Sequence, residues 1–405
     1  MFDINEPPVV RITRQRFLKQ RRLFIYFIFF VFFASFSYII FSGKSKRAHS
    51  RKQIMKHINS SNNPKPIIPL PNVDVLAHLD NKYSNYSIPE NTLIELWNFV
   101  QKSPINPKTG QHYIMYSIAN AGLSEFILNC VCSMRLANIP SNYHVTIALD
   151  FETYEALQNI GANVILWKSN FIKKAVNNVK IVEFYNIIKV KPTILHQFLL
   201  WNVEPILVDA DTIFNENPLH LFNDEVDFQV QCDSKEYYEI PYNVYPVPWQ
   251  VNLGFYKVRP SSTVMKLMPV WLERMYNSPK VHDQSSLRKI LKEYPTKWVK
   301  NDTNDTVIVD TTKLFGDEYP NLTFRFLDPM LITNAGGLFM EGRYNWSNQA
   351  QRLGLKRPEF IHFFHCGKNA LKKSYMRDND MWFIDKDKKC LDHQPEGSLS
   401  LTVWR

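Results

Sequence analysis

The sequence is poor in cysteine, and its cysteines are not spaced for a metal site. Five cysteines occur in 405 residues, and no two of them form a C-x-x-C pair. Cys130 and Cys132 are separated by one residue, which does not suit tetrahedral zinc ligation. An odd count in a long chain also argues against a fold built on a disulfide framework, although one or two disulfides are compatible with it. Zinc-finger and disulfide-scaffold classes are therefore disfavoured.

The chain also lacks net charge outside its N-terminal segment. Its formal net charge is +10. Residues 1–57 contain twelve Lys and Arg against only Asp3 and Glu6, so this segment accounts for the whole excess. The remainder holds 36 basic and 36 acidic residues. Because a nucleic-acid-binding domain is basic in the domain itself, we expect no nucleic acid as a partner.

One long apolar run is present at residues 23–42, LFIYFIFFVFFASFSYIIFS. Twenty uncharged residues at ~1.5 Å each reach roughly 30 Å, the thickness of a bilayer's hydrocarbon core. A cleaved signal peptide would have a shorter apolar region and a small-residue cleavage site. We therefore expect a cytosolic tail at 1–22 and a transmembrane signal anchor in the lipid bilayer at 23–42. Residues 43–82 begin basic and become rich in Ser, Asn and Pro, which predicts an extended stem.

Sequons, rather than charge, indicate how the anchor is oriented. Basic residues flank the anchor about equally, so the positive-inside rule gives no direction. All the N-glycosylation sequons follow the anchor, at Asn59, Asn85, Asn301, Asn304, Asn321 and Asn345. Such sequons belong to the lumenal side of a secretory membrane. Their placement predicts a type II protein in which residues 83–405 form a lumenal domain.

Between residues 112 and 211, short apolar runs alternate with helical patterns. Strands are expected at 112–120, 144–150, 163–167 and 204–211, and helices at 123–138, 151–160 and 182–201. This alternation predicts an α/β domain with a mainly parallel, Rossmann-type sheet and helices on both faces. Pro192 should interrupt the last helix, so its main part is expected at 192–202. Ligands of such sheets bind beyond the carboxyl ends of the strands.

Two acidic residues stand at such a strand end. Asp209 and Asp211 follow an apolar run, and residues two apart on an extended backbone point the same way, so both carboxylates can face one divalent cation. Hard oxygen ligands suit Mg²⁺ or Mn²⁺, and a diphosphate can fill the remaining coordination positions. The same spacing recurs in two pairs that follow no apolar strand, Asp378 with Asp380 and Asp385 with Asp387. We expect metal at the first pair and a solvated surface at the other two.

The first pair and three later blocks together resemble one known family. Residues 191–219 look like the core of the nucleotide-diphospho-sugar transferase domain of plant cell-wall xylosyltransferases and related animal proteins. They show a lysine-led helix, an apolar strand, a D-x-D and then Pro218. The later blocks follow in the family's order: N-x-G-F at 252–255, D-Q at 283–284 and a histidine motif at 362–368. Phe364 departs from the family's H-x-N pattern. The resemblance spans roughly residues 110–385 and implies a GT-A-like fold.

The resemblance assigns roles to the matching residues. It implies that Asp209 and Asp211 hold Mn²⁺ or Mg²⁺, and that His362 completes the coordination, with His365 as the alternative ligand. Lys191 is assigned to the nucleotide-sugar donor. The lysines of the late motif are further candidates for diphosphate oxygens, with Lys368 taken first and Lys372 and Lys373 as alternatives.

The N-x-G-F and D-Q blocks are assigned to catalysis. Asn252, Asp283 and Gln284 would bind the sugar or the acceptor through amide and carboxylate hydrogen bonds. From the residues alone, Asp283 is equally suited to cap the helix that follows it, and Gly254 can simply ease a strand near a ligand. Capping and ligand contact are compatible, since helix N-termini face binding sites readily.

The resemblance implies an enzyme that moves a monosaccharide from a nucleoside diphosphate sugar, in the first place a UDP-sugar, to a glycan or glycoprotein acceptor. It implies retention of anomeric configuration, in which the leaving phosphate can take the acceptor proton. The anchor and stem resemble those of resident Golgi transferases, with the endoplasmic reticulum as the alternative location. Two other functions stay open: a catalytically silent lumenal carbohydrate-binding protein that kept the fold, and a glycoside hydrolase with two carboxyl groups and no obligatory metal.

Overall fold

The computed structural model describes most of the chain beyond residue 86. The described residues are 87–168, 182–233, 250–278, 280–293, 295–301, 304–317, 319, 321–335, 338, 354–363 and 368–392. They all belong to one compact unit, Leu70–Arg405. The predicted tail, anchor and stem lie outside the described residues, as does His365. Within the described residues, no helix is both long enough and apolar enough to cross a bilayer.

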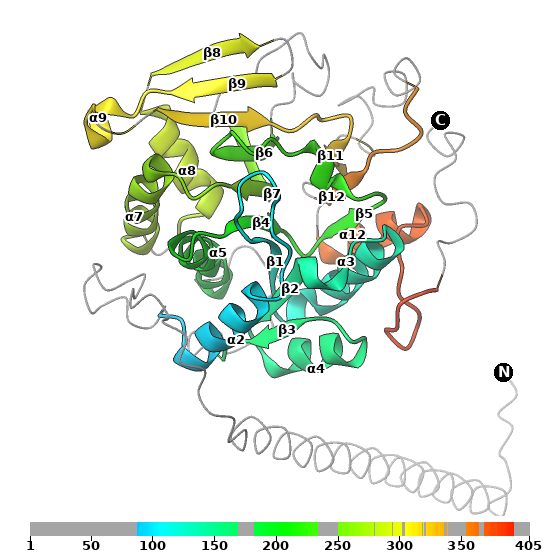
Figure 1. Ribbon diagram of the computed structural model, residues 1–405. Helices are drawn as coiled ribbons and strands as arrows, with labels where there is room; N and C mark the ends of the chain where they lie inside the picture. Colours follow the sequence, from blue (N-terminus) through cyan, green and yellow to red (C-terminus); the bar gives the residue numbers. More distant parts are fainter. Residues whose placement is uncertain are drawn as a thin grey trace, which may run out of the picture. The chain divides into compact units, whose positions relative to one another are not determined.

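The strands form two sheets (Figure 1). Their bounds are β1 Tyr113–Ala119, β2 His144–Ala148, β3 Val164–Leu166, β4 Glu204–Val208, β5 Thr212–Phe214, β6 Phe228–Cys232, β7 Val251–Val258, β8 Thr296–Asn301, β9 Asn304–Val309, β10 Leu322–Phe326, β11 Ile332–Asn334 and β12 Phe360–His362. The larger sheet has the order β3-β2-β1-β4-β7-β6-β10-β9-β8, and the smaller one the order β11-β12-β5. All strands of the larger sheet run in one direction except β7 and β9. The predicted mainly parallel sheet is therefore present, with β7 inserted in reverse between β4 and β6.

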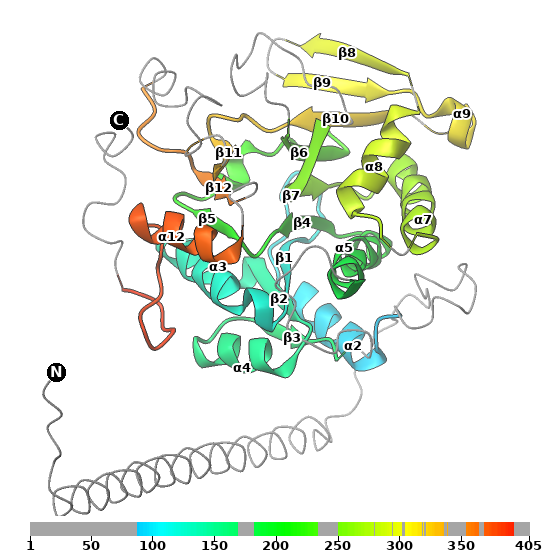
Figure 2. The same ribbon diagram turned by 180° about the vertical axis from the view of Figure 1, so that it is seen from behind.

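Helices cover both faces of the larger sheet, as expected. Their bounds are α2 Glu90–Val100, α3 Ser124–Leu136, α4 Phe151–Asn159, α5 Val182–Leu200, α7 Ser262–Tyr276, α8 Asp283–Lys292, α9 Thr312–Phe315 and α12 Asn369–Asp378, with 3-10 turns η2 Ala121–Leu123, η3 Ser141–Tyr143 and η4 Pro218–Leu221. Helices α5, α7 and α8 lie on one side of the sheet in both views, and α3 and α12 lie on the other side with the smaller sheet (Figures 1 and 2).

The two faces of the sheet build two separate hydrophobic cores. Tyr116 and Leu207 point into the core beneath α5, α7 and α8. Their chain neighbours Met115 and Ile206 point into the core beneath α3, α12 and the smaller sheet. Because successive residues of a strand face opposite ways, a strand buried on both faces reads as a continuous apolar run, as the sequence of β4 does.

The expected break at Pro192 is wrong. Helix α5 continues through this residue from Val182 to Leu200. Proline removes one N–H from the helix ladder and crowds the preceding turn. Burial on both sides of it holds the helix together, because Ile188 and Leu195 are both in the core. The Thr193 hydroxyl adds a hydrogen bond to the Lys189 carbonyl at 2.9 Å. Tertiary packing therefore outweighs the local penalty.

One disulfide is present among the described cysteines. It joins Cys132 on α3 to Cys390, which lies beyond α12 and is 258 residues away in sequence. Cys130 and Cys232 are fully buried. A single long-range bond agrees with the expectation that cysteines do not form the framework of this fold.

Candidate metal centre

Asp209 and Asp211 emerge at the carboxyl end of β4, as predicted. Val208, the last residue of the strand, is fully buried, and the chain enters β5 directly after Asp211. The Asp209 N–H donates to the carbonyl of Gly254 at 2.8 Å, which extends the pairing of β4 with β7 by one residue. The side chains of Asp209 and Asp211 are only 21% and 14% exposed. Two carboxylates this close and this buried require positive charge nearby.

The smaller sheet delivers His362 to the same place. Strand β12 runs antiparallel to β5 with His362 opposite Thr212, and the N–H of Phe363 donates to the carbonyl of Asp211 at 2.9 Å. As a result, Nε2 of His362 lies 3.5 Å from Oδ1 of Asp211 and 3.6 Å from Oδ2 of Asp209. Ligand atoms of the three residues all lie within 4.8 Å of one another. The structure thus brings together the three residues that the sequence assigns to metal.

A hydrogen bond sets which nitrogen of His362 faces the carboxylates. Nδ1 lies 3.2 Å from Oε1 of Gln231 on β6, and both side chains are buried. Since an amide oxygen only accepts, Nδ1 carries the proton and the lone pair of Nε2 is directed toward the carboxylates. Sequence reasoning missed Gln231. Its only local signal is a glutamine within a strand whose residues are all buried.

The N-x-G-F segment makes room for His362. The pairing of β6 with β7 shifts between Val230 and Gln231, so β7 carries an irregularity there. Gly254 lies within this irregularity, and its N–H donates to Oδ1 of Asn252 at 2.9 Å. A Cβ on Gly254 would overlap the imidazole of His362. Irregular strands often re-aim groups near functional sites, and glycine permits close approach. The glycine of the N-x-G-F motif is therefore explained by sterics, because a larger residue at position 254 would displace the His362 ring.

Two lysines face the two carboxylates. Lys191 of α5 donates to Asp209, and Nζ of Lys372 on α12 lies 2.5 Å from Oδ2 of Asp211. Burial alone would lower the pKa of Lys191, but the Asp209 carboxylate holds it above its usual value. Burial alone would raise the pKa of Asp211, but the ammonium group of Lys372 holds this pKa well below its usual range. The Asp211 carboxylate is therefore ionised in the folded protein.

The structure distinguishes the three lysines of the late motif. Lys372 reaches Asp211, whereas Lys368, the first candidate from the sequence, is exposed at the N-terminus of α12. Lys373 pairs with Glu125 of α3. Lys372 therefore takes the place beside the carboxylates for which Lys368 was named, because it lies one helical turn further along α12.

Asp283, Gln284 and Asn252 lie close together, and their contacts are largely internal. Oε1 of Gln284 accepts from the Leu253 N–H at 3.1 Å, and Oδ1 of Asn252 accepts from the Gly254 N–H. Asp283 is the first residue of α8 rather than its cap, and its Oδ1 accepts from the Gln284 N–H at 2.8 Å. Burial raises the pKa of Asp283.

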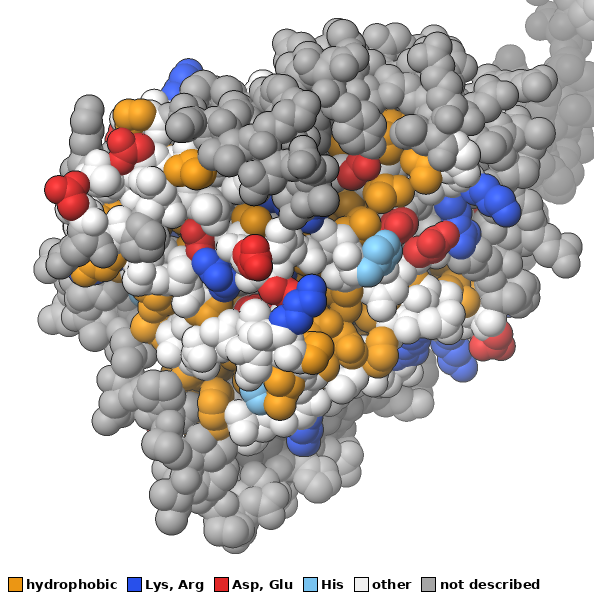
Figure 3. All heavy atoms as spheres, turned by 45° about the horizontal axis from the view of Figure 1, so that its top comes forward, with side chains coloured by type: hydrophobic (Ala, Val, Ile, Leu, Met, Phe, Trp, Pro, Cys, Tyr) orange, Lys and Arg blue, Asp and Glu red, His pale blue; other side chains and the backbone are white. Residues whose placement is uncertain are grey.

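Two polar atoms of this group have no partner. Among the described residues, Oδ2 of Asp283 and Nδ2 of Asn252 are buried without a hydrogen bond. Buried polar atoms are almost always paired, so these two atoms are candidate contacts for a ligand that carries hydroxyl groups. Figure 3 shows acidic and basic side chains gathered in the middle of one face of this unit.

The two other D-x-D pairs lie away from such surroundings. Asp378, Asp385 and Asp387 are exposed, and Asp380 is half-buried just after α12. Within the described residues neither pair joins a cluster that could hold a metal. The solvated surface expected for them is confirmed.

The chain matches the model of the nucleotide-diphospho-sugar transferase family over residues 141–376. It belongs to that family. The match covers more than half of the chain and includes Asp209, Asp211, His362 and Lys372. Membership of this nucleotide-diphospho-sugar transferase family makes the protein a glycosyltransferase. No curated protein matches the chain.

Several solved glycosyltransferases resemble this family member at low similarity. The apo bifunctional glycosyltransferase WbbM is 13% identical, with a TM-score of 0.38, and the likeness covers 66% of this chain and 48% of that one. Apo mouse xyloside xylosyltransferase 1 is 14% identical, with a TM-score of 0.37 and coverage of 62% and 98%. The galactosyltransferase LgtC, bound to donor and acceptor sugar analogues, is 13% identical, with a TM-score of 0.37 and coverage of 65% and 99%. These values carry neither substrate nor mechanism to the present chain.

Proposed function

We propose that this glycosyltransferase moves a monosaccharide from a UDP-linked donor to a glycan or glycoprotein acceptor, assisted by Mn²⁺ or Mg²⁺ held by Asp209, Asp211 and His362. One observation carries the proposal. Two carboxylates and an imidazole nitrogen from separate elements converge at the end of β4, with Nε2 of His362 3.5 Å and 3.6 Å from carboxylate oxygens.

The residues present fit a hard divalent cation. Carboxylate oxygens with one neutral imidazole suit Mn²⁺, and the bond from Nδ1 to Gln231 supports coordination through Nε2. When bound, such an ion would act as a Lewis acid that neutralises charge on the departing nucleoside diphosphate. Lys191 and Lys372 bring two ammonium groups to the same carboxylates, where they can donate to phosphate oxygens.

The unpaired atoms beside the metal centre suit a sugar. Oδ2 of Asp283 can accept from a hydroxyl group and Nδ2 of Asn252 can donate to one. Leaving a buried polar atom unpaired costs about 1–3 kcal/mol, so a hydroxyl-rich ligand is favoured over an apolar one. Gln284 acts indirectly, because its side chain holds the backbone next to Gly254. The proposal includes retention of configuration, in which the leaving phosphate takes the acceptor's proton.

We propose that the enzyme is a single-pass type II protein of the Golgi membrane, with the endoplasmic reticulum as the alternative. The apolar run at 23–42, the stem composition of 43–82 and the sequons beyond them support this topology. The Cys132–Cys390 disulfide also supports a lumenal domain at 83–405, because such bonds persist in oxidising compartments.

Calorimetry on the full chain in detergent tests the proposal. We expect UDP to bind when Mn²⁺ is present and to bind at least about tenfold more weakly after chelation, since the metal offsets the charge of the diphosphate. A screen of nucleotide sugars for turnover with Mn²⁺ then identifies the donor. Turnover that survives chelation would contradict the metal assignment.

A further inference from the structure

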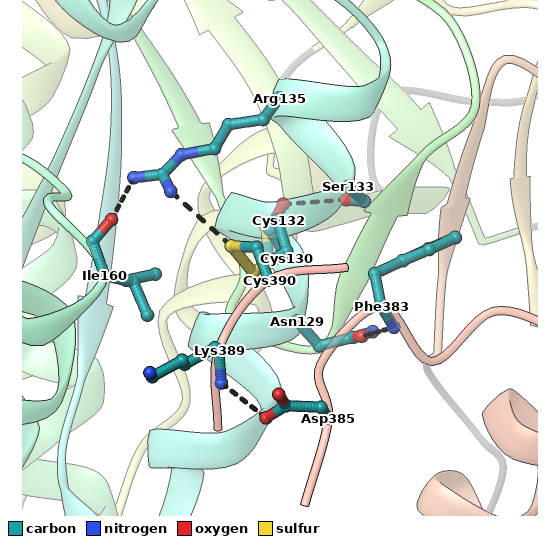
Figure 4. The surroundings of a disulfide bond; sticks show 10 residues. All are labelled: Asn129, Cys130, Cys132, Ser133, Arg135, Ile160, Phe383, Asp385, Lys389 and Cys390. Carbon is teal, nitrogen blue, oxygen red and sulfur yellow. Dashed lines mark hydrogen bonds between the residues drawn. A yellow bond between two sulfur atoms is a disulfide. The ribbon is translucent and has the colours of Figure 1, made fainter. Parts of the chain in front are cut away.

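The chain continues past the family match in a segment that returns to α3. The match ends at residue 376, inside α12, while the structure describes the chain to residue 392. Figure 4 shows this later segment beside α3, where Cys390 is bonded to Cys132. We refer to residues 381–390 as the clamp.

Asn129 holds the other end of the clamp. It lies one helical turn before Cys132 on α3, and its side chain makes two hydrogen bonds to clamp backbone, of which Figure 4 shows the one to Phe383. Nδ2 donates to the Met381 carbonyl at 3.0 Å, and Oδ1 accepts from the Phe383 N–H at 2.6 Å. Asn129 is fully buried, so loss of these bonds would leave polar atoms unpaired in the core. Helix α3 therefore contacts the clamp near both of its ends, through Asn129 at one end and through the disulfide to Cys390 at the other.

Helix α12 connects the clamp to the metal centre. Lys372 on α12 reaches Asp211, and Met376 near the end of the same helix is fully buried. Its sulfur lies 3.8 Å from Nδ2 of Asn129. The helix is therefore fixed at its far end by the residue that also fixes the clamp.

The remaining ties between α12 and α3 are weaker. Lys373 pairs with Glu125, and the side chains of these two residues are 26% and 37% exposed, respectively. Asn369 donates to the Gly122 carbonyl at 3.2 Å. Partly exposed ion pairs contribute little to stability. The buried Asn129 bonds and the disulfide hold the segment that directly follows α12, and Met376 packs the end of α12 against Asn129.

We propose that the clamp is a positioning device for Lys372. By fixing α12, it holds the ammonium group beside Asp211, where it meets the diphosphate of the donor; this rests on the proposed function. A lysine side chain has a flexible stem, so its charge acts on a ligand effectively only when its helix is fixed in place. None of the three metal ligands lies on α12, so loss of the clamp should weaken nucleotide binding without weakening Mn²⁺ binding.

The test is a double-mutant cycle on the full chain with Cys390→Ser and Lys372→Met. Calorimetry measures Mn²⁺ binding alone and UDP binding in the presence of Mn²⁺. We expect Lys372→Met to weaken UDP binding about tenfold and Cys390→Ser to weaken it about threefold or more. Neither substitution should weaken the binding of Mn²⁺ alone by more than about twofold, and Lys372→Met should strengthen it, because it removes a cation that pairs with Asp211. In the Lys372→Met background, Cys390→Ser should cause no further loss, because its effect passes through the missing ammonium group.

Reduction of the wild-type chain, followed by desalting, breaks the same bond without a substitution and serves if Cys390→Ser folds poorly. It should weaken UDP binding in the wild type and have no effect on Cys390→Ser. Equal losses from Cys390→Ser in both backgrounds, or unchanged UDP binding with a lowered unfolding temperature, would overturn the inference. If the wild-type chain bound Mn²⁺ but not UDP, the proposed function would be refuted instead. The assignment of the donor's diphosphate as the ligand of Lys372 would then be refuted as well.

Discussion

Gly254 and His362 are packed so closely that residue 254 has room for a hydrogen but not for a methyl group. A Cβ at this position would lie 2.0 Å from Cε1 and 2.3 Å from Nδ1 of the imidazole. The ring cannot simply retreat, because Nδ1 is hydrogen-bonded to Gln231 and the backbone of β12 is paired with β5. The absence of a side chain at Gly254 on β7 therefore allows the imidazole of His362 to occupy its position at the metal centre.

Gly254→Ala should weaken Mn²⁺ binding by about tenfold or more, since misplacing a support of a metal ligand has effects of that size. Gly254 is not among the glycines with positive φ, so alanine adds no backbone strain and the effect falls on the imidazole. Calorimetry with Mn²⁺ measures the loss, and circular dichroism checks the fold. In a His362→Ala background the same substitution should have no further effect on Mn²⁺ affinity. If Gly254→Ala left the Mn²⁺ affinity unchanged in a chain that retains His362, the steric argument would be refuted.

Gln231→Leu should lower Mn²⁺ affinity about 10- to 100-fold, because Nδ1 of His362 loses the acceptor that fixes its proton. Gln231→Glu supplies an acceptor of the same length and should retain most of the affinity. Pulsed electron paramagnetic resonance on bound Mn²⁺ detects a coordinated imidazole nitrogen directly. That signal should be present in the wild type and in Gln231→Glu and weakened in Gln231→Leu. Equal signals in all three proteins would show that Gln231 does not orient the ligand.

Local signals in the sequence were sufficient for the parallel half of the sheet and for Asp209 and Asp211. Each expected strand there is an apolar run between turns, and the acids follow the last run directly, so no long-range information is needed. The insertion of β7 in reverse was not predicted, because strand order depends on pairing across the chain. The predicted helix break at Pro192 failed for the opposite reason. The local rule that proline interrupts a helix was outweighed by the burial of the helix on both sides of Pro192.

The rest of the site depends on contacts that no local pattern records. His362 could be named only through the family resemblance, because its position follows from the register of β12 with β5. Gln231 reaches it across 131 residues, and Cys132 reaches Cys390 across 258. The choice of Lys372 over Lys368 depends on where α12 begins and how it lies on α3. Such relationships are set by tertiary packing, which spacing in one sequence does not determine.

Asp211→Asn should abolish donor turnover while leaving the domain folded, because it removes one charge from the metal centre with almost no change in shape. Asp317→Asn is the matched control, since Asp317 is an exposed aspartate outside α12 and the clamp. The control should keep wild-type turnover with Mn²⁺ and wild-type unfolding temperature. Turnover by Asp211→Asn at the control's rate would exclude Asp211 as a ligand that the reaction needs.

His144 should make the fold sensitive to acid independently of the metal centre. Its Nε2 lies 2.9 Å from Oγ of Ser117, between β2 and β1, and burial lowers the pKa of His144 from 6.5 to about 3. Between these values the unfolded chain binds a proton at this residue and the folded chain does not. The free energy of unfolding therefore falls as the pH falls below about 6.5, by up to about 1.4 kcal/mol per pH unit, until the folded pKa is reached.

His144→Gln should remove this contribution, because glutamine keeps a hydrogen-bonding side chain but does not titrate. Urea unfolding of both proteins from about pH 7 to pH 4 measures the effect, and the difference between the two curves cancels every other titrating group. The variant should lose less stability than the wild type as the pH falls, whichever of the two is more stable at pH 7. Parallel curves would mean that the folded chain accepts the proton as readily as the unfolded one, so burial could not be what keeps His144 neutral.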